Sequence, residues 1–325
     1  MSDFVSMGEL LVEFVANEDN VSLANTASFV KAPGGAPANV AVAVQKLGLS
    51  AGFVGKVGDD PFGDYLRQSL DETGVDTRYL LVDRIARTTA VFVAVWDDGR
   101  KDLCFYRNPG ADMLLTEDDI TTHMFEGGRC FHFGSITFID EPSAAAQHKA
   151  LRIARERKMM ITYDPNYRPT LWPNVQIARS VIQSSFQYCH LAKISEEEWE
   201  VATGHPELDA GIEWVLSQGV ELVVVSRGER GALVTNGEYR IDLPAYEVEV
   251  VETTGAGDGF MAAMIVRLLS EREKHGSLAR IDEATMRAAI DFANAVGALV
   301  CTRRGAIPAL PTLAQVERFM HSNRS

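Results

Sequence analysis

Short apolar runs alternate along the chain with longer segments in which apolar residues recur every three or four positions. The short runs are typical of buried strands, and the longer pattern is typical of amphipathic helices. The expected strands are 4–7, 51–57, 130–134, 160–164, 190–194 and 222–226. The expected helices are 38–47, 61–73, 143–158, 257–270 and 283–301. This alternation predicts an α/β fold in which helices cover both faces of a mainly parallel sheet.

Two regions interrupt the alternation, because residues 12–33 and 87–107 have the pattern of extended segments. In the second region, stretches 88–96 and 102–107 flank Asp98-Gly99, a dipeptide that favours a hairpin turn. We expect one small β-sheet that closes over a site as a lid or pairs with a second subunit. An antiparallel extension of the main sheet is the alternative. Residues 1–325 are thus expected to form one domain, with a lid from roughly 12–33 and 87–112.

The composition limits the kinds of ligand. Of the 325 residues 46% are hydrophobic and 23% are charged, and the formal net charge is -14. Binding of nucleic acid needs a basic surface, so none is expected here. A small anion is compatible with the charge, provided that its site supplies positive charge from arginine, a metal ion or backbone amides.

The cysteines and the N-terminal residues indicate a cytoplasmic location. The four cysteines, at 104, 130, 189 and 301, are far apart and form no C-x-x-C pair. Neither a disulfide scaffold nor a zinc cluster is therefore expected. Residues 1–8 lack the basic segment and apolar run of a signal peptide. No run of 18 apolar residues occurs, so no membrane span is expected.

One run of small and polar residues, TTGAGD at 253–258, leads directly into an apolar helix. Glycines allow backbone N–H groups to converge at a helix start, where the helix dipole also favours an anion. Asp258 would lie beside that anion and take a proton from an attacking hydroxyl, as phosphoryl transfer requires. A single aspartate at this place could instead only stabilise the helix N-terminus, but the complete run favours the catalytic role.

The run resembles the second signature of the PfkB family of carbohydrate kinases, also called the ribokinase-like family, and the resemblance covers nearly the whole chain. It implies an anion hole with its catalytic base at Gly255, Ala256, Gly257 and Asp258. The first signature is matched by PGGAPANVA at 33–41. It assigns Gly34, Gly35 and Asn39 to sugar binding, although a glycine pair alone also fits a tight turn before a helix.

Within the family the chain is most similar to the fructokinases, through the strings at 32–42, 107–112, 164–168 and 193–198. This resemblance implies that Arg107 reaches from the lid to the sugar. It also implies that Arg168 offsets the charge of the transferred phosphate. Without the resemblance, Arg107 could be a surface residue at a strand end and Arg168 part of a salt bridge beside a helix.

The resemblance also implies an ATP site. The positions that match its phosphate loop and adenine pocket are Ser226, Gly228, Gly231 and Asn294. Ser195 and Glu198 match an Asn-x-x-Glu motif near Mg²⁺, with serine in place of asparagine. The Ser-x-x-Glu spacing is also that of a helix capping box, which is the structural alternative.

Two positions depart from the family pattern. Glu13 stands where the family usually has an aspartate that binds sugar hydroxyls, and we expect Glu13 to bind them. Glu252 stands where an aspartate usually precedes the threonine pair. Family members often hold a potassium ion at this place, so Glu252, Thr254 and Gly305 are expected to bind K⁺.

The implied fold is a three-layer α/β/α sandwich with a β-lid, and the nucleotide is expected at the carboxyl ends of its strands. The implied activity is ATP-dependent phosphorylation of a sugar, with D-fructose as the expected substrate. Alternatives are ribose, a nucleoside, 2-keto-3-deoxygluconate or an aminoimidazole riboside. Another class is a non-catalytic sugar or nucleotide sensor, and an NAD-dependent oxidoreductase is disfavoured because its glycine fingerprint is absent. The family resemblance also suggests a homodimer formed through the lids.

Overall fold

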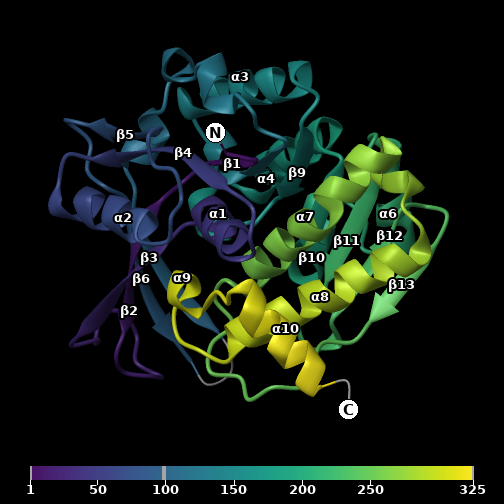
Figure 1. Cartoon of the computed structure of the whole chain (residues 1–325). Helices are drawn as coiled ribbons and strands as arrows, with labels where there is room; N and C mark the ends of the chain where they lie inside the picture. Colours follow the sequence, from purple (N-terminus) through teal and green to yellow (C-terminus); the bar gives the residue numbers. More distant parts are fainter. Residues whose placement is uncertain (1, 97–99, 324–325) are drawn as a thin grey trace.

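The computed structural model describes residues 2–96 and 100–323. Its largest element is a nine-stranded sheet in the order β13-β12-β11-β10-β9-β8-β1-β4-β5 (Figure 1). The strands are β1 (Phe4–Met7), β4 (Ala51–Gly58), β5 (Leu80–Asp83), β8 (Cys130–Gly134), β9 (Met160–Asp164), β10 (Leu191–Ser195), β11 (Leu222–Ser226), β12 (Ala232–Thr235) and β13 (Arg240–Leu243). Neighbouring strands from β11 to β5 are parallel, whereas β12 and β13 add an antiparallel edge. The expected mainly parallel sheet is confirmed.

Helices cover both faces of this sheet, which makes three layers. One face packs against α1 (Ala36–Lys46), α2 (Pro61–Asp71), α7 (Ala256–His275), α8 (Glu283–Cys301), α9 (Ala306–Ala309) and α10 (Leu313–Ser322). The other packs against α3 (Ser143–Glu156), α4 (Val175–Ser185), α5 (Trp199–Thr203) and α6 (Leu208–Ser217). Strand residues alternate between the two cores, as Leu222 and Val224 do against Val223 and Val225.

A second sheet has four strands in the order β3-β2-β6-β7. Its strands are β2 (Leu11–Ala16), β3 (Phe29–Gly34), β6 (Ala90–Val95) and β7 (Lys101–Tyr106). Strand β2 pairs with β3 in antiparallel and with β6 in parallel orientation, so the two extended regions of the sequence form one sheet. The expected small sheet is confirmed, and an extension of the main sheet is wrong. The turn expected at Asp98-Gly99 lies outside the described residues.

The predicted core strands agree with the structure to within one residue at their ends, and the helix boundaries differ more. Helix α1 begins at Ala36, two residues early, because Pro37 fits the first turn of a helix. Helix α7 continues to His275 and ends at Gly276, which has a φ of 77°. Four of the elements with no sequence-based expectation are β5, β12, β13 and α4.

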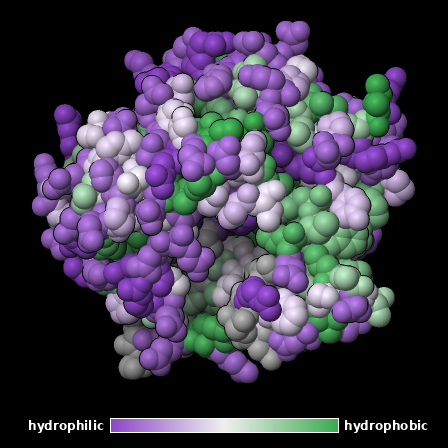
Figure 2. Space-filling view, turned by 180° about the vertical axis from the view of Figure 1, so that it is seen from behind, coloured by the Kyte–Doolittle hydropathy of each residue, from purple (hydrophilic) through white to green (hydrophobic). Residues whose placement is uncertain are grey.

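Helix α8 is the one helix of the described ranges that is long and apolar enough to cross a membrane by length and composition. However, 56% of its apolar window is buried inside the molecule. There its residues Phe292 and Val296 belong to the same core as α7. The apolar pattern of α8 is thus that of a core helix. The face of the molecule seen in Figure 2 is mostly hydrophilic, with smaller hydrophobic areas.

The carboxyl ends of the parallel strands meet at one edge of the large sheet. Asp164, Ser195 and Ser226 are the last residues of β9, β10 and β11. The chain leaves β1 at this same edge and enters strand β2 of the four-stranded sheet within a few residues. In open α/β sheets ligands bind at this edge, and the four-stranded sheet therefore lies beside the expected site.

Candidate active site

Helix α7 brings Asp258 into its first turn. The residue before the helix, Gly255, has a φ of 82° and provides no side-chain cap. A Cβ atom there would lie only 3.0 Å from the Cα of Ala306, so the position needs glycine. An uncapped helix start presents backbone N–H groups and the positive end of the helix dipole, which are the features that the predicted anion site requires.

The carboxyl of Asp258 is buried and joined to α1. The Nδ2 group of Asn39 donates a hydrogen bond to Oδ2 of Asp258 at 2.8 Å. Burial raises the pKa of Asp258 to about 6, and the hydrogen bond from Asn39 acts in the opposite direction. Nearby charges also affect the pKa of Asp258: Asp164 raises it, and Lys193 and Arg168 lower it. The carboxyl is thus mostly ionised at neutral pH and is a stronger base than an exposed aspartate.

A buried ion pair lies behind the glycine run, and the sequence analysis missed it. The Nζ atom of Lys193 is 2.7 Å from Oδ2 of Asp164, and each side chain is 5% exposed. A Cβ atom on Gly257 would lie 3.4 Å from this ammonium group. Burial disfavours the charge, but the carboxylates of Asp164 and Glu198 keep the pKa of Lys193 above its ordinary value. A lysine within the apolar run of β10 is the signal that could have revealed the pair, since buried charges are usually paired or functional.

Ser195 and Glu198 form the capping box that was the structural alternative. The Ser195 N–H donates to Oε1 of Glu198 at 2.8 Å, and the Tyr167 N–H donates to Oε2 at 2.7 Å. Burial and the nearby Asp164 carboxylate raise the pKa of Glu198. The cap does not exclude a second role, because this carboxyl lies in the same buried charge group as Lys193.

The acidic residues at this edge fit a metal that is shared with a ligand. No group of three or more histidine, cysteine or acidic side chains arranged to hold a metal ion by itself occurs among residues 2–96 and 100–323. Asp164 and Glu198 nevertheless give two buried carboxyls close to the α7 N-terminus. Mg²⁺ is commonly bound by one or two carboxylates together with substrate phosphates, and the donor set here suits that arrangement.

The glycine pair between β3 and α1 is in close contact with two glutamates. A Cβ atom on Gly34 would lie 2.4 Å from Oε1 of Glu13. One on Gly35 would lie 2.4 Å from the carbonyl oxygen of Glu9, and Gly35 also has a φ of 111°. Glycine is thus required at Gly35, where a Cβ would meet backbone, whereas one at Gly34 would displace the Glu13 side chain. The structure brings Glu13 to the glycine pair, as the sequence analysis expects.

Arg107, which follows β7, is fixed by a buried ion pair. Its Nε group donates to Oδ2 of Asp112 at 2.7 Å, with 6% of one side chain and 3% of the other exposed. Asp112 also accepts a hydrogen bond from Oγ1 of Thr89. The alternative of an exposed surface arginine is therefore wrong. The Nε contact uses one of five guanidinium donors, so others can serve a ligand.

Two of the predicted nucleotide residues, Gly231 and Asn294, lie against one backbone segment, Leu243 and Pro244. A Cβ atom on Gly231 would lie 2.0 Å from the carbonyl oxygen of Leu243, so only glycine fits there. The Nδ2 group of Asn294 donates to the carbonyl of Pro244 at 2.9 Å. Asn294 is buried rather than at a helix surface. Ser226 ends β11, and Gly228 follows it with open space around its Cα.

Two of the three predicted cation residues, Glu252 and Gly305, are in contact. Oε2 of Glu252 accepts a hydrogen bond from the Gly305 N–H at 2.9 Å. The Glu252 N–H donates to the carbonyl of Cys301, which holds the strand-like segment before Thr254 against the end of α8. The contact between Gly255 and Ala306 continues this packing. The Glu252 carboxylate and the backbone near Gly305 thus lie next to the α7 N-terminus.

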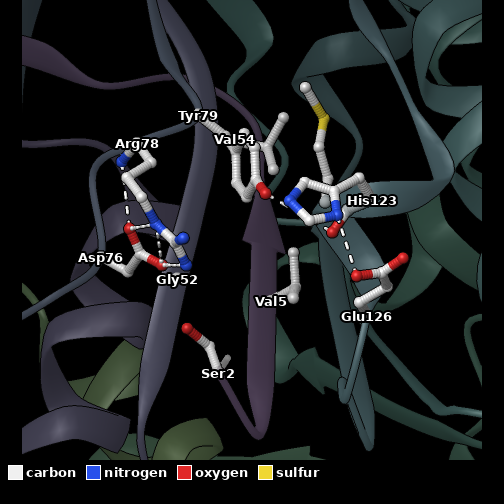
Figure 3. A pocket seen from close by; sticks show the side chains of 10 residues that line it. Ser2, Val5, Gly52, Val54, Asp76, Arg78, Tyr79, His123 and Glu126 are labelled. Carbon is white, nitrogen blue, oxygen red and sulfur yellow. Dashed lines mark hydrogen bonds and ion pairs between the residues drawn. The ribbon is translucent and has the colours of Figure 1, made fainter.

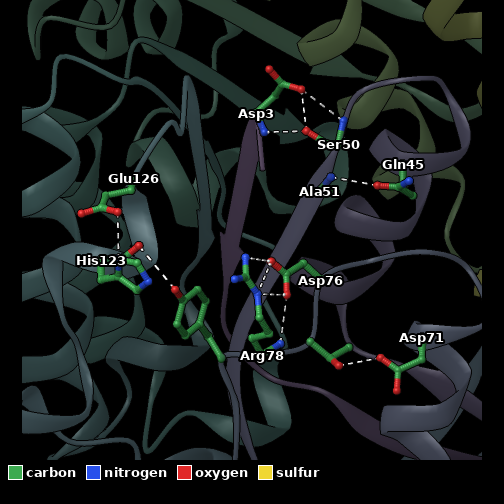
Figure 4. A network of polar contacts seen from close by, with 11 residues as sticks. Asp3, Gln45, Ser50, Ala51, Asp71, Asp76, Arg78, His123 and Glu126 are labelled. Atoms are coloured by element: carbon green, nitrogen blue, oxygen red, sulfur yellow. Dashed lines mark hydrogen bonds and ion pairs between the residues drawn. The ribbon is translucent and has the colours of Figure 1, made fainter. Parts of the chain in front are cut away.

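A separate pocket lies at the opposite edge of the sheet, by the amino ends of β1 and β4 (Figure 3). Its charged groups pair with each other, Arg78 with Asp76 at 2.6 Å and His123 with Glu126 at 2.8 Å. The same edge is held by further polar contacts, among them a 2.6 Å hydrogen bond from Ser50 to Asp3 (Figure 4). These contacts serve the structure of that edge, and none of the predicted site residues lines the pocket.

The comparisons with known proteins agree with the geometry. A model of the pfkB family carbohydrate kinases matches residues 1–313. The chain belongs to the PfkB family of carbohydrate kinases. This PfkB kinase is 42% identical over 319 residues to Fructokinase-1 of Oryza sativa subsp. japonica, which covers 98% of this chain and 97% of the relative.

Two solved structures are similar to this PfkB kinase over its full length. Fructokinase of Xylella fastidiosa with bound ATP matches with a TM-score of 0.91, 29% identity and 100% of both chains. A double-mutant fructokinase of Vibrio cholerae O395, in its fructose-, ADP- and potassium-bound form, matches with a TM-score of 0.86, 31% identity and 98% of both chains. The expected ribokinase-like fold and the class of carbohydrate kinase are thus confirmed, which sets aside a sensor and an oxidoreductase.

Proposed function

We propose that this kinase transfers the γ-phosphoryl group of ATP to D-fructose and forms fructose 6-phosphate and ADP. The observation that carries the proposal is Asp258, a buried carboxyl with a raised pKa at an uncapped helix start. Fructose rather than another sugar is supported by the likeness to fructokinases over nearly the whole chain.

In this proposal Asp258 takes the proton of the sugar hydroxyl while the hydroxyl oxygen attacks the γ-phosphorus of ATP. The bond to the β-phosphate oxygen breaks, and ADP leaves with the bonding electrons. The N–H groups of the run Gly255-Ala256-Gly257 would stabilise the charge on the migrating group. Arg168 and the buried Lys193 would add positive charge, as their effects on the pKa of Asp258 indicate.

The sugar would be held between the glycine pair and the lid. Glu13 would accept hydrogen bonds from two neighbouring hydroxyls, since a carboxylate has two acceptor oxygens. Arg107 would donate to the sugar while Asp112 keeps its guanidinium in place. The other proposed sugar contacts are Gly34, Gly35 and Asn39.

ATP would lie across the carboxyl ends of β10 and β11. Its contacts would be Ser195, Ser226, Gly228, Gly231 and Asn294. The chemistry of the site favours Mg²⁺ as the metal, with Asp164 and Glu198 facing an ion that the phosphates bind. When bound, such an ion offsets the charge of the phosphate oxygens.

Glu252, Thr254 and Gly305 would bind K⁺. Support comes from the contact between Glu252 and Gly305 and from the potassium-bound form of the Vibrio cholerae relative. The test is kcat/KM in potassium chloride against tetramethylammonium chloride at one ionic strength. Equal values would contradict the proposal.

We further propose that residues 1–325 act as one kinase domain, with 12–33 and 87–112 as its lid, and that two copies pair through their lids in the cytoplasm. Support for pairing is an apolar cluster of the lid, separate from both main cores, that consists of Leu11, Val91 and Val93 with the partly buried Val15, Val95, Leu103 and Phe105. Sedimentation velocity tests pairing, and cell fractionation tests location. If only monomer sediments at micromolar concentration, pairing is contradicted. If the protein is recovered with membranes, the cytoplasmic location is contradicted.

The decisive test of the activity is Asp258→Asn. An amide has nearly the shape of the carboxyl but accepts no proton, so kcat with fructose should fall by at least about 10²-fold. ATP binding, measured by calorimetry, should persist because the phosphates contact backbone amides. Coupled ADP detection measures the rate.

The control is Asp118→Asn, at an exposed position, which should keep wild-type turnover. The same assay with ribose, a nucleoside, 2-keto-3-deoxygluconate and an aminoimidazole riboside tests the substrate. Turnover of Asp258→Asn near that of the wild type would overturn the role of Asp258. A higher kcat/KM for another substrate would overturn fructose alone.

A further inference from the structure

Helix α1 is capped by a side chain from another part of the chain. Its N-cap residue, Gly35, has no side chain, and α1 has no side-chain cap of its own. Oε1 of Glu9, 27 residues earlier, accepts a hydrogen bond from the N–H of Ala36, the first helical residue, at 3.2 Å. A carboxylate at a helix N-terminus is favoured by the helix dipole, so Glu9 does for α1 what an Asp or Ser cap usually does.

The main chain of Glu9 lies against the same glycine. The carbonyl oxygen of Glu9 is the atom that a Cβ on Gly35 would meet at 2.4 Å. Glu9 also sits where the chain passes from β1 into lid strand β2, and Gly35 where it returns from β3 to α1. Glu9 therefore links two of the connections between the large sheet and the lid, the one from β1 to β2 and the one from β3 to α1.

The turn that Glu9 holds includes groups of the proposed sugar site. Gly34 and Gly35 directly precede Ala36. The Asn39 N–H donates to the carbonyl of Gly35 at 2.9 Å, and the Asn39 side chain contacts Asp258. A shift of the first turn of α1 would thus move the glycine pair and Asn39 together.

The surroundings make this contact hard to replace. Glu9 is 5% exposed. Burial raises the pKa of Glu9 to about 7, while Arg107 lowers it and Asp112 raises it. The contact with Ala36 is partly buried, so a shortened side chain would leave the Ala36 N–H without its acceptor in a place that water reaches only in part, which is costly.

We propose that Glu9 is a positioning residue for the sugar, whose carboxyl oxygen fixes the first turn of α1 and with it Gly34, Gly35 and Asn39. The inference rests on the proposed sugar site. It concerns the acceptor oxygen of Glu9 rather than its charge, since the contact is a hydrogen bond to one backbone N–H. The side chain touches neither phosphate nor the attacking hydroxyl in this role.

The test compares Glu9→Gln, which keeps an acceptor oxygen at the same reach, with Glu9→Ala, which removes it. Glu9→Ala should raise KM for fructose at least about tenfold, while KM for ATP stays within about twofold. Glu9→Gln should stay within about threefold of the wild type for both substrates. Glu156→Ala, at an exposed position of α3, should change neither value.

Glu9→Asp gives an independent comparison if Glu9→Ala fails to fold, since the shorter side chain keeps the charge but withdraws the oxygen. It should resemble Glu9→Ala. A lower melting temperature with unchanged KM for fructose would show a structural role only and overturn the proposal, as would equal rises for both substrates. Absence of fructose turnover in the wild type would instead refute the proposed function itself.

Discussion

Burial raises the pKa of the Asp258 carboxyl, whereas the hydrogen bond from Asn39 lowers it. Burial alone favours the protonated acid, which could not act as a base. The Asn39 amide and the cations behind the helix start stabilise the carboxylate, and the pKa of Asp258 settles at about 6. The balance gives a base that is ionised at neutral pH and still accepts a proton readily.

This balance predicts the pH dependence of the reaction. Below pH 6 Asp258 holds a proton, so kcat/KM for fructose should fall as the pH decreases and should level off above about pH 7. Asn39→Ala removes a hydrogen bond to the carboxylate, raises the pKa of Asp258 further and should move the acidic limb to higher pH. The measurement is kcat/KM from pH 5 to 9 in buffers of constant ionic strength.

Asn323→Ala, near the exposed end of α10, serves as the control and should keep the wild-type profile. An acidic limb that stays in place in Asn39→Ala would show that Asn39 does not tune the pKa of Asp258.

Helix α2 shows how a single cap can join elements far apart in the sequence. Oδ1 of Asp60 accepts hydrogen bonds from the N–H groups of Phe62 and Gly63, both at 3.0 Å. Its Oδ2 accepts one from the N–H of Thr88 at 2.8 Å, just before lid strand β6. The same carboxylate thus caps α2 and holds the entry to the lid.

Asp60→Ala should therefore lower the free energy of unfolding by about 1 to 2 kcal/mol at pH 7. Burial raises the pKa of Asp60, but the hydrogen bonds from Thr88 and Gly63 outweigh it, and the pKa is lowered overall. This stabilisation is present above the unfolded pKa of about 4 and is lost as the pH falls through the lower folded pKa. Urea unfolding at pH 7 and at lower pH measures it.

Asp64→Ala, at an exposed position of the same helix, should change stability by less than about 0.5 kcal/mol. Equal losses in the two variants would mean that the cap contributes nothing specific.

The core elements could be predicted because a strand buried on both faces is a continuous apolar run, as in Leu222–Ser226. Edge strands such as β13 have an exposed face and mixed residues, so their pattern resembles a loop. In the site, Asp258 and the glycines have a local signature. Lys193 stands out as a charge within an apolar run but gives no sign of its partner, and Glu9 has no local signature, because the partners Asp164 and Ala36 are distant in sequence and only the fold brings them together.

At the scale of the whole molecule, the two roles proposed for the lid, sugar binding and pairing, fall on one face of its sheet. Register places Glu13 opposite Val91, and Val91 opposite Phe105, so Glu13 shares a face with the apolar cluster of the lid. Side chains on one face of a sheet are neighbours. A partner lid that covers the cluster would therefore lie close to the proposed sugar site.

The proposed pairing predicts that Leu103→Lys, which places a charge within this cluster, converts dimers to monomers at micromolar concentration, because an unpaired charge is costly in an apolar interface. Sedimentation velocity measures the change. Cys104→Lys adds the same charge one residue further along β7, on the opposite face, and should leave the dimer intact. Dissociation in both variants, or in neither, would contradict pairing through this face.

The hydrogen bond between Asn39 and Asp258 joins residues 219 positions apart, and this separation has a consequence for biosynthesis. At roughly 5 to 20 residues per second, the ribosome needs roughly 10 to 40 seconds after Asn39 to reach Asp258. During that time the lid strands and α1 exist without a base or an anion site. A nascent chain could therefore bind neither substrate productively, and phosphorylating activity would arise in one late step of synthesis.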